Sequence, residues 1–379
     1  MHTPTHSHQR GTLEVKFAHL RRTLAVTTLI ALAATVAACS VNGSKATSGN
    51  GAGVSGSIAG AGASSQQAAV AAWKVGFESD NPNSTINYDP VGSGGGRTQF
   101  LNGGVQFAGS DAYLKKEELA KVTNACARGE LIEAPVYISP IAVAYRISGI
   151  TDLQLSAPVI ADIFSGNITK WNDPKIIADN PGKTMPDLTI TPVHRSDESG
   201  TTQNFTDYLN KAAPQQWPHK PHGSWPLKGG EAAKGTAGVV QAIKAGDGTI
   251  GYADESQVAD LGKAKVKVGS EYVTISAEAA TKIIDSSPVA AGRPQYSHAL
   301  DIKRDTTEAG NYPIVLTSYA LACTKYKDKQ TAELVKSWLT YIFSEDGQKA
   351  AQQSAGSAPI SNKTREAAMK GINAITTAN

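Results

Sequence analysis

The chain has 379 residues, of which 40% are hydrophobic and 18% are charged, and its formal net charge at pH 7 is +3. This hydrophobic content is sufficient for globular folding, and the length exceeds what a single hydrophobic core usually serves, so we expect two domains. The weak positive charge includes no basic run and no interleaved aromatic and basic residues, which disfavours nucleic acid as a partner.

The N-terminal region has the pattern of an export signal. Arg21 and Arg22 precede an uncharged run over residues 23–38, which is shorter than the ~20 residues of a permanent transmembrane helix. The run ends in small residues, as the cleavage sites of signal peptides do, and Cys39 follows directly. A cysteine at this place favours a lipoprotein signal peptide over residues 1–38, with Cys39 lipidated, rather than an ordinary signal peptide.

After the leader, residues 39–56 are rich in Gly, Ser, Asn and Ala and predict a flexible tether. Short apolar runs then alternate with helical patterns, which indicates α/β domains with largely parallel sheets. A helix after Lys329 has one apolar stripe. The segments that predict strands are residues 84–88, 136–138, 141–145, 188–193 and 314–320. In such sheets ligands bind at the carboxyl ends of strands, where helices begin.

One such helix start lies in residues 194–202, His-Arg-Ser-Asp-Glu-Ser-Gly-Thr-Thr. The segment places Arg195 beside small hydroxyl and glycine residues, before an amphipathic pattern that includes Phe205, Tyr208 and Leu209. The first N–H groups of a helix are unpaired and partly positive, hydroxyls add donors, and arginine offers a planar fork. These groups suit a tetrahedral oxyanion, although an ordinary capped helix would explain this segment equally well on its own.

Two further segments have the same chemistry. Residues 91–100 follow a predicted strand with Val-Gly-Ser-Gly-Gly-Gly-Arg, which lets the backbone approach an anion closely. The Lys-Ser/Thr end of a Walker P-loop is missing. Residues 60–65, Gly-Ala-Gly-Ala-Ser-Ser, resemble half of a dinucleotide fingerprint without its third glycine, and a helical pattern begins at Gln66. Three such helix starts favour one shared anion site.

Asp111 follows a short apolar strand and is unexpected in an anion site. It could be a helix N-cap or a turn residue. If it faces the anion, an ionised carboxylate can only accept hydrogen bonds, so the anion must carry a proton. Phosphate keeps at least one proton near neutral pH and sulfate keeps none, so Asp111 favours phosphate.

The segments 60–65, 92–96, 109–111 and 195–201 resemble, in order and spacing, the phosphate-contacting loops of the substrate-binding proteins of bacterial ABC phosphate importers. The resemblance covers essentially everything after the leader. It implies a two-domain α/β fold of the periplasmic-binding-protein kind, type II-like, with a ligand cleft between the domains. It implies Asp197 as the acidic partner that orients Arg195. The phosphate ligands that it implies are Ser64, Ser65, Ser93, Asp111, Arg195, Ser199, Gly200 and Thr201.

The resemblance also implies a topology. Domain I would contain residues 57–139 and 313–379, and domain II would contain residues 140–312. The first three loops would come from domain I and the Arg195 loop from domain II, so that the ligand favours the closed state. The chain departs from the family at Ser65, where the family commonly has an aromatic residue; Ser65 keeps the backbone N–H but loses the packing.

Cys126 and Cys323 both fall in the segments assigned to domain I, and an exported protein is oxidised. We therefore predict an intradomain disulfide rather than two buried free thiols. No metal and no cofactor are expected, because the neighbouring His219 and His222 lie in a Pro/Gly-rich loop without cysteine or carboxylate support.

The expected function is extracytoplasmic, high-affinity binding of inorganic phosphate and its delivery to an ABC permease, without chemistry on the ligand. The protein would act as a lipid-anchored monomer at the cell membrane. The alternatives are a receptor for another tetrahedral oxyanion such as sulfate, which Asp111 disfavours, and an exported hydrolase using Ser199 with His194. The sequence has no Gly-x-Ser-x-Gly motif, which disfavours a hydrolase. A phosphatase would need clusters of metal ligands, and the sequence has none.

Overall fold

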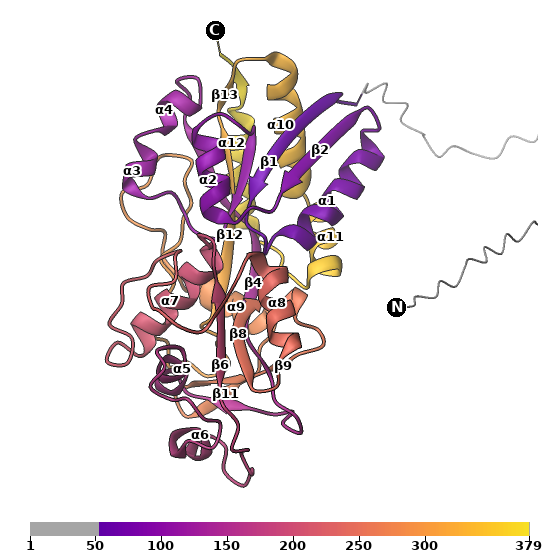
Figure 1. The fold of residues 1–379 in the computed structure, drawn as a ribbon. Coiled ribbons are helices and arrows are strands. Elements are labelled where there is room, and N and C mark those ends of the chain that lie inside the picture. Colours follow the sequence, from indigo (N-terminus) through magenta and orange to yellow (C-terminus); the bar gives the residue numbers. More distant parts are fainter. Residues whose placement is uncertain (1–52, 379) are drawn as a thin grey trace, which may run out of the picture. The chain divides into compact units, whose positions relative to one another are not determined.

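The computed structural model describes residues 53–378 (Figure 1). The predicted signal peptide, the lipidated Cys39 and the tether as far as residue 52 lie outside the described residues. No helix within residues 53–378 is both long enough and apolar enough to cross a membrane.

A mixed sheet runs through the molecule in the order β2-β1-β3-β12-β4-β8-β6-β7, and β9 also pairs with β4. Its strands are β1 (Gly56–Gly62), β2 (Ser84–Asp89), β3 (Phe107–Ser110), β4 (Leu131–Arg146), β6 (Thr191–Arg195), β7 (Glu231–Ala233), β8 (Thr249–Asp254), β9 (Gly262–Lys263) and β12 (Val315–Cys323). Two small sheets combine β5 (Gln154–Leu155) with β10 (Lys265–Val268) and β11 (Glu271–Val273), and β13 (Lys325–Tyr326) with β14 (Thr376–Thr377).

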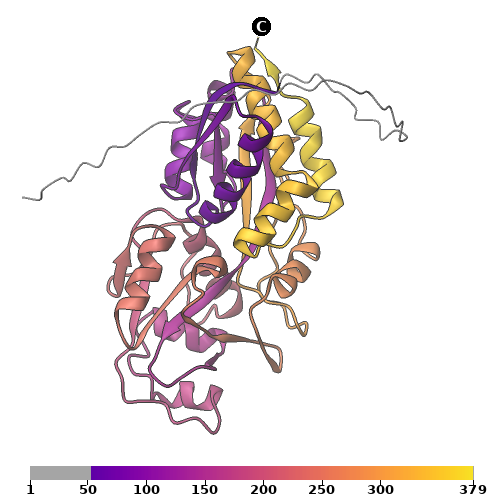
Figure 2. The same cartoon turned by 90° about the vertical axis from the view of Figure 1, so that its right-hand side faces the viewer.

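The long strand β4 joins the two halves of this sheet (Figure 2). Its first part pairs with β12 as far as Pro140, and from Ile141 onward it pairs with β8. Proline cannot donate to a ladder, and Pro140 lies where the strand exchanges one partner for the other. We call β1–β3, β12, the first part of β4 and their helices lobe A, and β6–β9, the second part of β4 and their helices lobe B.

The sheet differs from the prediction in two respects. The segments 136–138 and 141–145 form one strand, and the strand predicted over residues 188–193 begins later, at Thr191. The outer strands of both halves are parallel, as predicted, but β12 and β4 run antiparallel to their neighbours in the centre. Apolar periodicity identifies a strand but not its direction, because the side chains of parallel and antiparallel strands alternate equally.

In lobe A, α1 (Gln67–Asp80) packs on α11 (Glu345–Ala355), and α10 (Lys329–Ile342) packs on β1. Trp338 of α10 lies edge-on to Phe77 at 5.4 Å and contacts Phe107 at 5.8 Å between ring centroids, so the predicted apolar stripe is the core of this lobe. The other helices are α2 (Ser93–Leu101), α3 (Lys116–Leu119), α4 (Val122–Ala125) and α12 (Asn362–Asn373).

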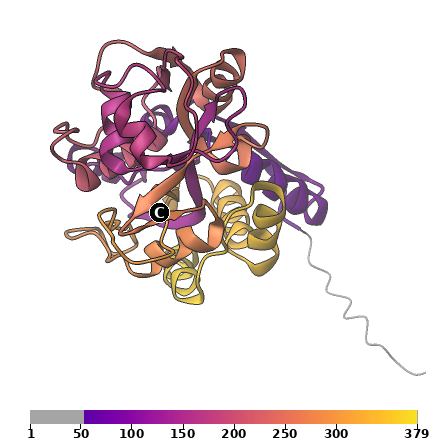
Figure 3. The same ribbon diagram turned by 90° about the horizontal axis from the view of Figure 1, so that it is seen from below.

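In lobe B, Phe205 stacks on Tyr252 with ring centroids 4.4 Å apart, and Phe164 lies edge-on to Phe205 at 4.9 Å. This aromatic cluster fixes α7 against β8. Seen from below, helices surround the strands of both lobes (Figure 3). The remaining helices are α5 (Ala157–Phe164), α6 (Pro174–Asp179), α7 (Gly200–Ala212), α8 (Gly235–Ala245), the 3₁₀ turn η1 (Glu255–Gln257) and α9 (Ala277–Asp285).

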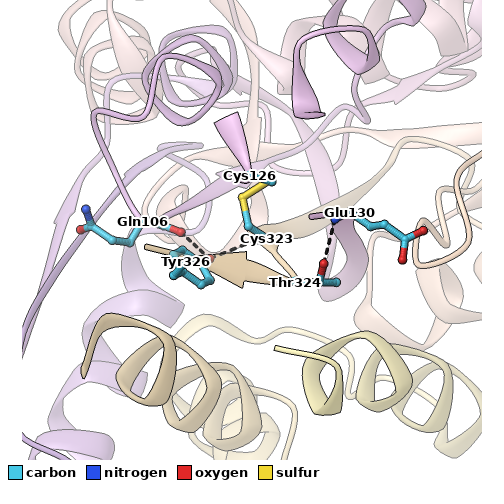
Figure 4. Close-up of a disulfide and its surroundings, with 6 residues drawn as sticks. All are labelled: Gln106, Cys126, Glu130, Cys323, Thr324 and Tyr326. Atoms are coloured by element: carbon cyan, nitrogen blue, oxygen red, sulfur yellow. Dashed lines mark hydrogen bonds between the residues drawn. A yellow bond between two sulfur atoms is a disulfide. The ribbon is translucent and has the colours of Figure 1, made fainter. Parts of the chain in front are cut away.

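A disulfide joins Cys126, after α4, to Cys323 at the end of β12, which confirms the predicted pair (Figure 4). Both cysteines are buried, and both lie in lobe A. Thr324 accepts a hydrogen bond from the backbone N–H of Glu130 at 2.7 Å, and the hydroxyl of Tyr326 donates to the carbonyl of Gln106 at 2.8 Å. The bridge therefore lies in a well-connected part of the lobe.

Asp254 lies at the end of β8 and gives one testable property of the fold. Its buried carboxylate accepts hydrogen bonds from the Tyr137 hydroxyl and the Ser256 backbone, and burial raises the pKa of Asp254 to about 7. The folded protein therefore binds the proton of the Asp254 carboxyl group more tightly than the unfolded chain does. As a result, the free energy of unfolding falls as pH rises from about 4 to about 7. Relative to wild type, Asp254→Asn should gain stability over this window, by at most roughly 4 kcal/mol at ~1.4 kcal/mol per pKa unit.

Urea unfolding of both proteins at several pH values between 4 and 8 measures this effect. A constant difference in unfolding free energy across this range would contradict a raised pKa at Asp254.

Candidate functional site

The predicted site residues come together at strand ends of the two lobes. Ser64 and Ser65 follow β1, Ser93 begins α2 and Asp111 follows β3, all in lobe A. From lobe B, Arg195 ends β6 and the next helix, α7, begins at Gly200. The named side chains are nearly inaccessible, with exposed fractions of 5% or less for Ser64, Ser65, Ser93, Asp111, Arg195, Ser199 and Thr201. The site is therefore shielded from bulk solvent, which strengthens its hydrogen bonds and charge interactions.

Asp111 lies at the centre of a hydroxyl network. Its carboxylate accepts hydrogen bonds from Ser65 at 2.7 Å, from Ser318 at 2.6 Å and, across the lobes, from Thr201 at 3.0 Å. Burial raises the pKa of Asp111, while these hydroxyls and the charge of Arg195 act in the opposite direction. The alternative role as a helix N-cap is wrong, because the N-cap of α3 is Lys115.

Asp197 holds the guanidinium of Arg195 in one plane. Nε donates to Oδ1 at 2.7 Å, Nη2 donates to Oδ2, and Oδ1 also accepts the backbone N–H of Gly235 at 3.0 Å. Burial alone would raise the pKa of Asp197, but the hydrogen bonds and charge of Arg195 bring it below the ordinary value. Within residues 53–378, Nη1 of Arg195 makes no hydrogen bond, so the orientation that Asp197 imposes leaves this group available to a ligand.

Two helices begin at the site. Ser199 caps α7 by accepting the N–H of Thr202 at 3.1 Å, which leaves its hydroxyl proton available to a ligand. Tyr252, in the aromatic cluster, bonds Thr202 at 2.7 Å and the backbone N–H of Arg195 at 3.2 Å. The N-cap of α2 is Gly92, whose φ of 91° requires glycine and whose missing side chain leaves room for Asp197.

A fourth helix start, at α8, also lies at the site and was not predicted from the sequence. Thr236, at the start of α8, bonds Ser64 across the lobes, with 3.0 Å between the hydroxyls and 3.1 Å from its N–H. Gly235 before it has a φ of 69° and contacts Asp197. Gly235-Thr236 followed by an apolar helical pattern has the same signature as the three predicted starts and could have been found. Ser318 could not have been predicted as a site residue, because it lies inside a buried and mainly apolar strand.

The site borders a cavity of about 140 Å³ between the lobes. Asp111 and Tyr113 line it from lobe A, and Asn204 and Asp207 line it from lobe B. Asn204 donates to the carbonyl of Asp111 at 2.7 Å, so this wall also connects the lobes.

The hydrolase alternative finds no support in this geometry. His194 stacks on Trp225 with ring centroids 4.9 Å apart, and its two ring nitrogens face the carbonyl oxygens of Arg195 and Gly229. The Ser199 hydroxyl caps α7 instead of pairing with an imidazole. Nor do the His, Cys, Asp and Glu side chains between residues 53 and 378 form a group of three or more that could hold a metal ion.

A two-lobed α/β fold with its site where strands of both lobes end and helices begin is the architecture of binding proteins that close around a ligand. The PBP superfamily domain matches residues 46–346. The chain is 34% identical to phosphate-binding protein PstS 3 of Mycobacterium leprae over 73% of this chain and 76% of that protein. It is 32% identical to PstS 2 of Mycobacterium tuberculosis over 95% and 100% of the two chains. The protein belongs to the PstS family of phosphate-binding proteins.

Solved structures have the same fold. A periplasmic phosphate-binding protein called PfluDING, bound with phosphate, superimposes with a TM-score of 0.67 at 24% identity, over 82% of this chain and 92% of that chain. A phosphate-binding protein of Stenotrophomonas maltophilia gives a TM-score of 0.65 at 20% identity, over 83% and 93%. These similarities confirm the predicted two-domain α/β fold class.

Proposed function

We propose that this protein binds inorganic phosphate outside the cytoplasm and delivers it to an ABC permease without chemical change. The observation that supports this proposal most strongly is that Arg195 and Asp111 are both buried in the same site, beside the N-termini of α2 and α7. The cation, hydroxyls and backbone N–H groups suit an oxyanion, and the carboxylate suits an oxyanion that still carries a proton. Relatives named for phosphate binding agree with this chemistry.

The proposed ligands are those expected from the sequence, with the addition of Thr236 through its contact with Ser64. Sulfate is the disfavoured alternative, because it has no proton to donate to Asp111 near neutral pH. A buried carboxylate with no donor opposite it repels such an anion and is costly to leave unpaired.

We further propose the domain division expected above, with residues 57–139 and 313–379 in domain I and residues 140–312 in domain II. The cross-lobe contacts Ser64–Thr236 and Asp111–Thr201 support a closed arrangement around the ligand. Outside the described residues, the signal pattern supports a lipid anchor at Cys39. The proposed protein is a monomer on the outer face of the cell membrane.

Calorimetric titration of residues 40–379 with phosphate, arsenate and sulfate tests the proposed function. Phosphate and arsenate should bind, and sulfate should bind at least ~10⁴-fold more weakly, as in sites where a buried polar group loses its partner. Comparable affinity for sulfate, or no binding of phosphate, would reject the proposal.

The same titration of Arg195→Gln tests the site. A charge-assisted hydrogen bond contributes ~1.5–3 kcal/mol, so phosphate binding should weaken at least about tenfold. Asp197 loses its charge partner but can still accept a hydrogen bond from the amide. Thermal unfolding of the empty variant should accompany the titration, because a loss of folded protein would otherwise imitate a loss of binding.

A further inference from the structure

We propose that an ion-pair network centred on Glu198 connects the two lobes beside the ligand site and slows the departure of the bound ligand. The network consists of Arg97, Lys115, Glu118 and Glu198. None of these residues belongs to the predicted ligand set. The inference rests on the proposed phosphate binding, and Glu198 is a positioning residue in it.

Glu198 is the lobe B member of the network. Its Oε1 accepts hydrogen bonds from Nη2 of Arg97 at 2.9 Å and from Nζ of Lys115 at 3.3 Å, and both cations are in lobe A. Its carbonyl oxygen accepts the backbone N–H of Gly94 at 3.1 Å. Both the side chain and the backbone of Glu198 therefore contact lobe A, and opening of the lobes breaks all three interactions.

The shape of lobe A and of the neighbouring loop leaves a slot for this side chain. A Cβ on Gly94 would lie 2.5 Å from Oε2 of Glu198, and one on Gly223 would lie 2.9 Å from its Cγ. Glycine at these positions thus permits the approach. Gly94 and Glu198 are the chain neighbours of Ser93 and Ser199, so the contact that closes the lobes also brings the N-termini of α2 and α7 to the same ligand.

The burial of Arg97 gives the network its strength. This side chain is 2% exposed, and Glu118, also in lobe A, accepts a hydrogen bond from its Nε at 3.0 Å. When the lobes open, Arg97 loses Glu198 but keeps Glu118 as a partner. Its buried charge is therefore never left unpaired, and this keeps the cost of opening low enough for closure to be reversible. Burial would raise the pKa of Glu198, but Arg97 and Lys115 lower it overall, so Glu198 is ionised at neutral pH.

The charge of Glu198, considered without its contacts to lobe A, predicts that its removal changes phosphate binding in the opposite direction. Glu198 adjoins Ser199, and removal of a negative charge near an anion site should tighten phosphate binding if the carboxylate acts only through its field. If it connects the lobes, its removal weakens binding and accelerates release. The sign of the change in affinity therefore separates the two explanations.

The test compares Glu198→Gln with Glu117→Gln, an exposed residue of α3 outside the network whose replacement removes the same charge. Stopped-flow release of phosphate from Glu198→Gln should be about tenfold faster and its affinity about tenfold lower, with the preference for phosphate over sulfate unchanged. Glu117→Gln should release phosphate at the wild-type rate. Unchanged release or tighter binding in Glu198→Gln would overturn the proposal.

A measurement without ligand keeps this inference separate from the proposed function. Spin labels on Val75→Cys of α1 and Ile177→Cys of α6, which are 72% and 43% exposed, report the distance between the lobes. Glu198→Gln should shift the distribution of this distance toward longer values, and Glu117→Gln should not. If the wild-type protein fails to bind phosphate, the proposed function is rejected, but the distance comparison still tests whether Glu198 connects the lobes. Identical distance distributions in Glu198→Gln and wild type would reject the ion-pair network.

Discussion

The Asp111→Asn variant should lose most of its preference for phosphate over sulfate, with the ratio of affinities falling at least about a hundredfold. The carboxylate in the wild-type site can only accept, whereas the amide can turn its NH₂ toward an unprotonated oxygen. The substitution also removes a negative charge close to the anion. Sulfate binding should therefore rise, while phosphate affinity changes little because the lost hydrogen bond is offset by reduced repulsion.

Titrations of both proteins with both anions measure this ratio. In the variant the single amide oxygen can still accept a hydrogen bond from Ser65 and from either Ser318 or Thr201, which bond to different oxygens of the wild-type carboxylate. Acidic pH provides an independent check. Burial raises the pKa of Asp111, so its protonated form, which can donate, becomes populated as pH falls. At low pH the affinity for sulfate relative to phosphate should rise in wild type, and it should rise less in Asp111→Asn. An unchanged ratio in the variant would mean that another residue sets the choice.

Removal of the disulfide should produce the largest loss of stability. Cys126 and Cys323 are separated by 197 residues, and model estimates for closing so long a loop approach ~5 kcal/mol, with smaller effects in practice. We expect Cys126→Ala/Cys323→Ala to lower the free energy of unfolding by about 3–5 kcal/mol. Phosphate binding should persist, because the bridge lies further along β12 than Ser318, the strand's contact with Asp111.

Urea unfolding of the oxidised wild type, the reduced wild type and the double variant measures this loss. The reduced wild type should resemble the variant, since both lack the cross-link. Equal unfolding free energies in the oxidised and reduced wild type would show that the bridge does not restrain the unfolded chain.

The local parts of the site could be predicted from the sequence. The helix starts at Ser93 and Gly200 follow from glycine and hydroxyl residues after apolar strands, and Asp111 stands out as a carboxylate among anion-binding groups. The pairing of Asp197 with Arg195 was implied by the family resemblance, and the structure contains it. These features are encoded within a few residues, which is the range over which periodicity and helix capping act.

The remaining features depend on contacts between distant segments. Ser318 reaches Asp111 because β12 pairs antiparallel with β3, and neither strand direction nor strand order can be read from apolar periodicity. The contact between Arg97 and Glu198 spans the two lobes in the same way. In the sequence both residues resemble ordinary surface charges at helix starts, and only the tertiary structure reveals that Arg97 is buried.

The order in which the chain passes through the two lobes has a consequence for biosynthesis. Lobe B is complete in sequence before β12 begins, so a growing chain can fold this half while lobe A still lacks β12, the strand between β3 and β4, and its three last helices. Cys126 is then translated long before its partner, and its thiol must stay unpaired until Cys323 follows. Synthesis that stops after lobe B and before β12 should therefore yield a chain with one folded half and an unpaired Cys126 thiol, a substrate for quality control rather than a partial receptor.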